Sequence, residues 1–304
     1  MKVIKPQTFN SATTLVSTSA VETLSNWAAG TYALNAKVLH PLTVNGVTFK
    51  YQWTSLVANN TATPGTDATK WLQGDVGNKD AMFDGQVNVS TTGTSPLTVT
   101  IRAPLANSVG FVGLVGSQLV VTVKDNGANP AVYTRTVNLD GSIIVDFYMY
   151  FFEPFVQLGE VVLTDLPPYL NGQITATLTS GSPVEIGEIV WGTSYVLSDK
   201  GIEQGASVSI IDYSRKDTDA DTGRTTFTRR AFSKRMSGQF MVANDRINSV
   251  QRILADLRAV PSVYIGSEDA QYAPLVVYGF YRDFSIDIAY PTTSLCRIEV
   301  EGLI

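Results

Sequence analysis

Polar and apolar residues alternate through the middle of the chain, between about residue 84 and residue 195. This period-two pattern is typical of strands that bury one face. It occurs at residues 97–101, 119–123 and 174–178, and turn signals lie at residues 125–127, 140–141, 171–172 and 180–183. Short strands separated by such turns predict an antiparallel sandwich.

Two further stretches complete this sandwich. Residues 143–152 (IIVDFYMYFF) are apolar on both faces and predict a central strand. Pro167 and Pro168 cannot take part in the hydrogen-bonded ladder of a sheet, so they predict a rigid corner.

The pattern changes beyond residue 203. Residues 208–210 and 225–231 predict two strands around a polar loop at 217–223. A helix follows, capped by Asn244 and ended by Pro261, because apolar residues recur there at intervals of three and four. These residues are Ile247, Val250, Ile253, Leu254 and Leu257, and further strands are expected at 262–265, 275–281, 284–289 and 295–300. One helix on an antiparallel sheet predicts an α+β domain.

Four segments are therefore expected: an N-terminal arm (1–25), a small β module (26–75), a β-sandwich (80–197) and an α+β domain (203–304). The arm is rich in Thr and Ser, and it either docks on a neighbouring protein or is a floppy terminus. The predicted fold class is mainly β with a C-terminal α+β domain: a small aromatic β module, an antiparallel jelly-roll-like sandwich, then a sheet covered by one helix.

Composition narrows the possible functions. The chain has 304 residues, 44% hydrophobic and 16% charged, which is enough for several domains with cores of their own. A net charge of −5 without a basic run argues against nucleic acid and anionic lipid as partners. Cys296 and His40 are the only residues of their types, so neither an intrachain disulfide nor a zinc site is expected. No segment has the pattern of a membrane span or an export signal, which predicts synthesis and folding in the cytoplasm.

The β module holds three of the four tryptophans. The spacing of its aromatic residues resembles the small chitin-binding type of carbohydrate-binding module over about 46 residues, Asn26 to Trp71. That resemblance implies sugar stacked on exposed rings. The candidate sugar-binding residues are Trp53, Tyr51, Trp27 and Trp71.

Two roles compete for these rings. Core packing is favoured for Trp27 and Trp71, while Trp53 and Tyr51 suit a core or a stacking platform equally. Residues 56–58 (LVA) stand where binding members carry a further aromatic pair, so a joint with another protein is the alternative.

Larger parts of the chain resemble other families. The middle segment is similar to galactose-binding jelly rolls, which serve as sugar binders or as spacers. Several phrases resemble the tail-associated proteins of long-tailed bacteriophages and prophages, which implies a component of the tail tip or baseplate. The phrases are at residues 71–84, 147–154, 161–178, 210–219, 229–236 and 278–304.

Other residues suggest a metal site or a catalytic base. Asp217, Asp219 and Asp221 suggest a calcium loop, but Gly223 comes one position late for an EF-hand and Thr228 replaces its last ligand, so a solvated hairpin is favoured. His40, next to a proline, is expected to be a turn residue.

Glu185 with Glu188, or Asp283 with Asp287, would be glycosidase pairs, but no motif selects them. The basic cluster at residues 229–235 (Arg229, Arg230, Lys234 and Arg235) could hold a polyanion, but with the three aspartates nearby it is expected to form salt bridges within or between subunits.

The sequence therefore predicts a non-enzymatic phage virion protein without cofactor or metal, made in the host cytoplasm. Its module would link the tail to host-surface glycans or to fibre, ring or hub proteins, as a homo-oligomer within a symmetric assembly. The alternatives are a purely structural adaptor without sugar binding, a polysaccharide depolymerase, and a secreted bacterial sugar-binding protein.

Overall fold

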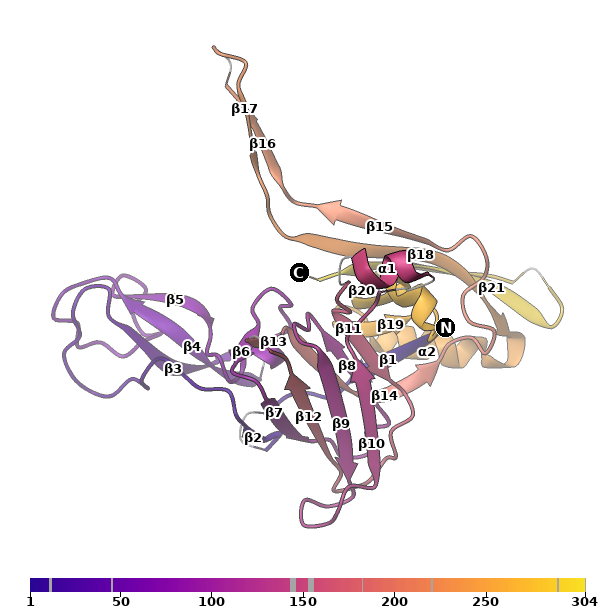
Figure 1. Cartoon of the computed structure of the whole chain (residues 1–304), viewed down its shortest axis with the longest axis horizontal. Coiled ribbons are helices and arrows are strands. Elements are labelled where there is room, and N and C mark those ends of the chain that lie inside the picture. The colour runs from indigo at the N-terminus through magenta and orange to yellow at the C-terminus, as the bar shows by residue number, and fades with distance from the viewer. Residues whose placement is uncertain are drawn as a thin grey trace. The chain divides into compact units, whose positions relative to one another are not determined.

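The computed structural model describes residues 1–10, 13–44, 46–142, 146–152, 156–181, 183–219, 221–288 and 290–303 (Figure 1). Strands account for 49% of the residues and helices for 9%. An antiparallel sheet and one helical segment of 13 residues lie in the C-terminal part. The predicted fold class is confirmed. No helix in the described part of the chain has the length and apolar character needed to cross a membrane.

The chain forms two compact units. Unit 1 consists of Met1–Pro6, Ser108–Gly110 and Val190–Ile304, and unit 2 consists of Gln7–Asn107 and Phe111–Ile189. This division differs from the four successive segments expected, because the first six residues group with the C-terminal part of the chain.

Unit 1 contains an antiparallel sheet and a helix. Its elements are β1 (Lys2–Pro6), β14 (Glu188–Val196, from Val190 on), β15 (Ser207–Asp212), β16 (Arg215–Thr218), β17 (Thr225–Thr228), β18 (Phe232–Ala243), η2 (Asn244–Arg246), α2 (Ile247–Asp256), β19 (Ser262–Ile265), η3 (Ala270–Leu275), β20 (Val276–Asp287) and β21 (Thr293–Gly302). From β14 the strands follow the order β1, β19, β20, β21, β18, β15. A single strand, β20, replaces the two expected between residues 275 and 289.

The strand β1 lies inside this sheet, which corrects the expectation of an arm or a floppy terminus for residues 1–6. It pairs with β14 on one side and β19 on the other, and Val3 and Ile4 are fully buried. The two strands approach closely: a Cβ atom at Gly192 would overlap the Lys5 carbonyl oxygen. Main-chain bonds on both edges together with apolar burial fix this segment.

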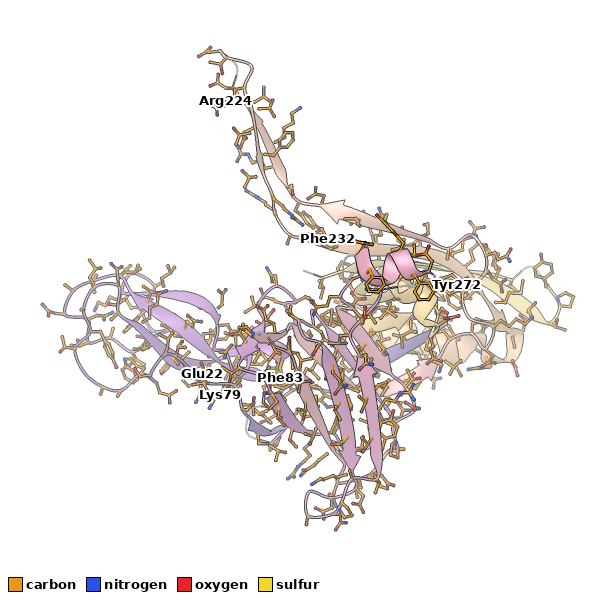
Figure 2. The ribbon with its side chains drawn as sticks, in the orientation of Figure 1. Glu22, Lys79, Phe83, Arg224, Phe232 and Tyr272 are labelled. Carbon is orange, nitrogen blue, oxygen red and sulfur yellow. The ribbon has the colours of Figure 1, made fainter. Side chains whose placement is uncertain are left out.

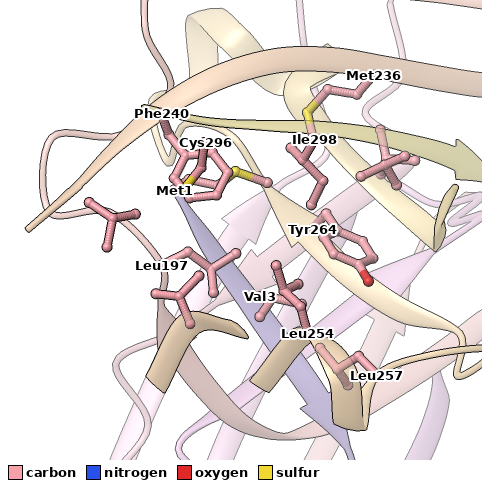
Figure 3. Close-up of a cluster of buried hydrophobic side chains, with 14 residues drawn as sticks. Met1, Val3, Leu197, Met236, Phe240, Leu254, Leu257, Tyr264, Cys296 and Ile298 are labelled. Atoms are coloured by element: carbon pink, nitrogen blue, oxygen red, sulfur yellow. The ribbon is translucent and has the colours of Figure 1, made fainter. Parts of the chain in front are cut away.

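The helix α2 covers one core of unit 1, as its apolar stripe predicts. Val250, Leu254 and Leu257 are buried against side chains of the sheet (Figure 3). The last strand, β21, alternates as expected, with Cys296, Ile298 and Val300 buried. The cluster of buried residues comprises Met1, Val3, Leu197, Met236, Phe240, Val242, Val250, Leu254, Leu257, Tyr264, Val277, Cys296, Ile298 and Val300.

Asn244 does not cap the helix, contrary to the prediction. Neither η2 nor α2 has a side-chain cap. The Asn244 Nδ2 donates to the carbonyl oxygens of Tyr290 and Pro291 at 3.1 and 3.0 Å, and its Oδ1 accepts from Ser294 Oγ at 2.7 Å. Asn244 therefore ties the start of the helical segment to the chain around the beginning of β21.

Unit 2 is built from short strands. Its elements are β2 (Leu15–Thr18), β3 (Lys37–Val44), β4 (Val47–Ser55), β5 (Trp71–Val76), η1 (Ala81–Phe83), β6 (Thr91–Gly93), β7 (Leu97–Arg102), the end of β8 (Ser108–Val112), β9 (Gln118–Lys124), β10 (Tyr133–Asn138), α1 (Phe147–Phe152), β11 (Glu160–Leu163), β12 (Gln173–Thr179) and β13 (Val184–Ile186). One sheet has the order β10-β9-β12-β7-β2, another β3-β4-β5, and β13 pairs with β6. The alternating strands predicted at β7, β9 and β12 are confirmed, with every second residue buried.

The prediction of a central strand at residues 143–152 is wrong for the part of this range that the structure describes. Residues 143–145 lie outside the described residues, and Phe147–Phe152 form the helix α1. Asp146 Oδ1 accepts a hydrogen bond from the Met149 N–H at 2.7 Å, which satisfies a free donor of the first turn. The rings of Tyr148 and Phe152, four residues apart, lie 4.9 Å from each other. The cap and this contact favour a helix over a strand.

Replacing Leu254 with alanine is expected to lower the free energy of unfolding by about 2–5 kcal/mol, because the buried side chain would leave a cavity. Urea denaturation followed by circular dichroism measures the change. The control, Gln251→Ala, lies on the exposed side of the same helix and should alter it by less than about 0.5 kcal/mol. Equal losses in both variants would contradict the assigned helix face.

Candidate functional site

The candidate aromatic residues belong to the sheet β3-β4-β5 of unit 2 and to the loops beside it. In β4, Tyr51 and Trp53 are two residues apart and therefore point to the same face. The register places His40 opposite Tyr51 and Val38 opposite Trp53. The structure thus brings the predicted residues into one small module.

Trp53 and Trp71 form the core of this module. They are 5% and 1% exposed. Trp53 Nε1 donates to the His40 carbonyl oxygen at 3.4 Å, and Trp71 Nε1 donates to the Ala62 carbonyl oxygen at 2.8 Å. The Tyr32 ring packs edge-on against Trp71, with centroids 5.5 Å apart. Neither tryptophan offers an open ring face on which a sugar could stack.

Trp27 and Tyr51 are only partly buried and pack against that core. The Trp27 ring meets the His40 ring at 90°, with centroids 5.4 Å apart, and its main-chain N–H donates to the Leu39 carbonyl oxygen at 2.7 Å. Trp27 Nε1 and His40 Nδ1 are buried and lack a hydrogen-bond partner within the described chain. Of the four candidate rings, Trp27 and Tyr51 are the two with ring surface left to contact a ligand.

A hollow of about 410 Å³ lies beside β3 and β4, within the size range of small-molecule sites. Its lining is partly polar and partly apolar. The polar residues are Glu22, Asn26, Thr48, Lys50, Lys79 and Asp80, and the apolar ones are Leu15, Leu24, Leu39, Pro41 and Phe49. Such a mixture suits a ligand with both hydroxyl groups and an apolar face.

The carboxylates of the hollow hold the chain around residue 79 in place. Glu22 accepts hydrogen bonds from the main-chain N–H groups of Asn78 and Lys79 at 3.1 and 2.8 Å, and Figure 2 shows Glu22 and Lys79 together. Asp80 Oδ2 accepts from the Lys50 N–H at 3.4 Å, and burial raises the pKa of the Asp80 carboxyl. These contacts make the hollow a fixed feature of unit 2.

The sequence did not predict the residues of the hollow. Glu22 falls in the expected N-terminal arm, Lys79 falls between the expected domains, and Asp80 is the first residue of the expected sandwich. The contact between Glu22 and Lys79 spans 57 residues, and no local pattern signals a contact of that length. The aromatic spacing could be recognised because it is local.

Unit 2 also contains a pair of acids, the partly buried Asp84 and the buried Glu188. Glu188 is 5% exposed and its Oε2 accepts from the Gly85 N–H at 3.0 Å. Asp84 Oδ1 accepts from the Gln86 N–H at 2.8 Å, while its buried Oδ2 has no partner among the described residues. Burial raises the pKa of Asp84 to about 7, with a contribution from Asp75.

Burial, and to a lesser extent the nearby Asp84, also raises the pKa of Glu188 well above its usual range. Both carboxyls therefore hold protons that free carboxylic acids would have released.

The carboxylate pairs proposed from the sequence lack glycosidase geometry. Glu188 is buried and bonded to main chain, so it cannot flank a substrate together with Glu185. Asp283 and Asp287 lie four residues apart on β20, about 13 Å along the strand, whereas inverting glycosidases place their carboxyls within about 9.5 Å.

The loop expected at residues 217–223 lies in a hairpin. Asp217 belongs to β16 and pairs with Arg215 at 2.7 Å, and Asp219 accepts from the main-chain N–H groups of Asp221 and Thr222. Across the described ranges no three His, Cys, Asp or Glu side chains gather as metal ligands. In the basic cluster, Arg235 forms an ion pair with Glu299 of β21 and not with the aspartates.

The acid pair predicts that stability falls as pH rises. The folded state keeps protons on Asp84 and Glu188 that the unfolded chain loses near pH 4, so the stabilisation is complete below that pH. It is lost as pH rises through about 7, where Asp84 ionises. Urea denaturation at pH 5 and pH 8 should show lower stability at pH 8.

Glu188→Gln should reduce this decline, because the amide cannot ionise. The control, Glu185→Gln, should retain the wild-type decline. A wild-type protein that gains stability between pH 5 and pH 8 would contradict the assignment.

Two comparisons with known proteins give no relative for this chain. No model of a known protein family matches it, and no curated protein sequence matches it either. Its function is therefore inferred from the residues and the geometry described above.

Proposed function

We propose that the chain is a structural protein of a bacteriophage tail tip or baseplate, linking the tail to host-surface or fibre contacts. The observation that carries this proposal is the exposed aromatic surface of α1. Phe147, Tyr148 and Phe152 are 87%, 71% and 69% exposed. Each such ring covers about 150–250 Å² when buried. Together they form an apolar patch of a few hundred Å², and the largest patch of this size on a monomer is often functional, which supports a neighbouring protein that covers it.

The resemblance to phage tail proteins supports this proposal, because several of the matching phrases include exposed parts of the structure. Its phrase at residues 147–154 includes α1, and its phrase at 210–219 includes strands of unit 1 that are largely exposed. Its phrase at 229–236 is exposed only up to Phe232, because Ser233 and Met236 of β18 are buried. The segments that resemble tail proteins therefore include surfaces that an assembly would bury.

Contact with a host glycan is the second part of the proposal. Trp27 and Tyr51 keep some ring surface, and the hollow beside β3 and β4, which neither ring lines, has polar groups in its lining. A shallow site of this kind gives weak affinity, but several copies in a symmetric tail would raise avidity by effective concentration.

The adaptor without sugar binding is the competing candidate. It is favoured by the burial of Trp53 and Trp71, whose rings pack against the module itself. In that case the module would bind fibre, ring or hub proteins through its remaining exposed surface.

Antibody-gold labelling of purified phage particles, with serum raised against this chain, tests the location. Gold at the distal end of the tail is the expected outcome, because the resemblance is to tail-tip and baseplate proteins. Gold on the capsid would keep a structural role and reject the tail tip, and unlabelled particles would reject the virion role.

Titration with host surface polysaccharide tests the glycan contact. Tryptophan emission is expected to change on binding, and Trp27→Ala should abolish the change, because Trp53 and Trp71 are shielded. The control, Leu34→Ala, alters an exposed side chain before β3 and should behave as wild type. An unchanged emission spectrum in the wild-type protein would favour the adaptor.

A further inference from the structure

A long segment of unit 1 has no core of its own. We name residues 207–232 the arm; it runs from β15 through the β16–β17 hairpin to the start of β18. Every described residue in it except Ile211 is exposed. Figure 1 shows β16 and β17 as a narrow ribbon that extends from β15 and β18, away from the other strands of unit 1. A two-stranded ribbon without a buried face is marginally stable by itself.

The arm also has free strand edges. Among the described strands, β15 ends the sheet and pairs with β18, while β16 and β17 pair with each other alone. The outer edge of β15 therefore carries main-chain N–H and C=O groups without a strand beside them. Such an edge is a template for another chain.

The edge of β15 lacks the features that normally block pairing. Residues 207–211 (SVSII) include no charged residue and no proline, and the one charge of β15 is Asp212 at its end. Val208 and Ile210 are 37% and 68% exposed. Free edges in monomeric proteins are usually protected by lysine, proline or a bulge. An unprotected apolar edge indicates a strand that is paired in the functional state.

We propose that the arm binds a second copy of this chain, with β15 pairing antiparallel to β15 of the partner across a twofold axis. The sequence of β15 is self-complementary for this arrangement. Pairing centred on Ser209 sets Val208 opposite Ile210 of the partner subunit, and the symmetry repeats the contact. Apolar cross-strand pairs on one face stabilise antiparallel strands. The contact is isologous, so it closes on itself as a dimer.

The size of the arm fits such an interface. Residues 207–232 are 26 residues, and a standard-size protein interface takes about 20–30 residues from each side. The large exposed side chains of the arm include Tyr213, Phe227 and Phe232. Figure 2 shows its side chains standing out along both strands between Arg224 and Phe232. Burial of these rings would supply apolar area beyond that of β15.

The charge of the arm is compatible with another copy as the occupant. The arm carries five basic and four acidic residues and is therefore nearly neutral, whereas the whole chain has a net charge of −5. Its basic residues are Arg215, Lys216, Arg224, Arg229 and Arg230, and its acidic residues are Asp212, Asp217, Asp219 and Asp221. Two nearly neutral arms can meet without strong like-charge repulsion. The dimer does not depend on a role in a virion, since it concerns this chain alone.

Sedimentation equilibrium of the full chain tests the proposal. The wild-type protein is expected to form a dimer, and Ile210→Lys should weaken the dimer by at least about tenfold by placing a charge on the edge. Ile210 is 68% exposed, so the monomer should keep its fold. The matched control, Leu170→Lys, changes an equally exposed leucine of unit 2 and should leave the dimer unchanged.

Hydrogen exchange at β15 provides a second readout. Its main-chain amides should exchange more slowly in the wild-type dimer than in Ile210→Lys, and Val208→Lys should act like Ile210→Lys. A wild-type protein that remains monomeric at every concentration would overturn the proposal. A dimer of undiminished affinity in both lysine variants would overturn it as well, because the contact would then lie elsewhere. Labelling of the tail is independent of either result.

Discussion

Unit 1 depends on main-chain pairing between distant parts of the chain. The strand β1 bonds to β14 on one edge and to β19 on the other, and the Met1 nitrogen donates to the Ser198 carbonyl oxygen across 197 residues. Without β1, the facing edges of β14 and β19 would bury unpaired N–H and C=O groups, at about 1–3 kcal/mol each. Met1 and Val3 would also be missing from the core. Contacts so distant in sequence form late, because their loops are costly to close.

This constraint explains which parts of the fold the sequence could predict. The alternating strands β7, β9 and β12 and the apolar stripe of α2 were predicted, because each needs only a local period matched to one buried face. The interior position of β1 was not predicted, because a sequence of five residues with moderate apolar content is compatible with an extended N-terminal segment and with a sheet. At α1 the apolar run predicted a strand, but a local cap at Asp146 favoured a helix.

The candidate site was also predicted only in part. The sequence identified the aromatic module, but not which rings would be buried. Trp53 and Trp71 fill a core with few aliphatic side chains, so their rings serve the stability of the module. The hollow and the acid pair were not predicted, because Glu22 contacts Lys79 and Glu188 contacts Gly85 only after folding. The sequence located a region, and the fold determined which of its side chains are buried and which keep exposed surface.

The arm has a consequence for the lifetime of the protein. A protease of trypsin's specificity cuts beside lysine and arginine in exposed chain, and the arm offers five such residues with no core around them. A copy whose arm is covered by a partner would resist cleavage, whereas a solitary copy would be cut there first. If the arm pairs as proposed, degradation would remove unassembled copies selectively, and the segment proposed to join two chains would also mark those that have not joined.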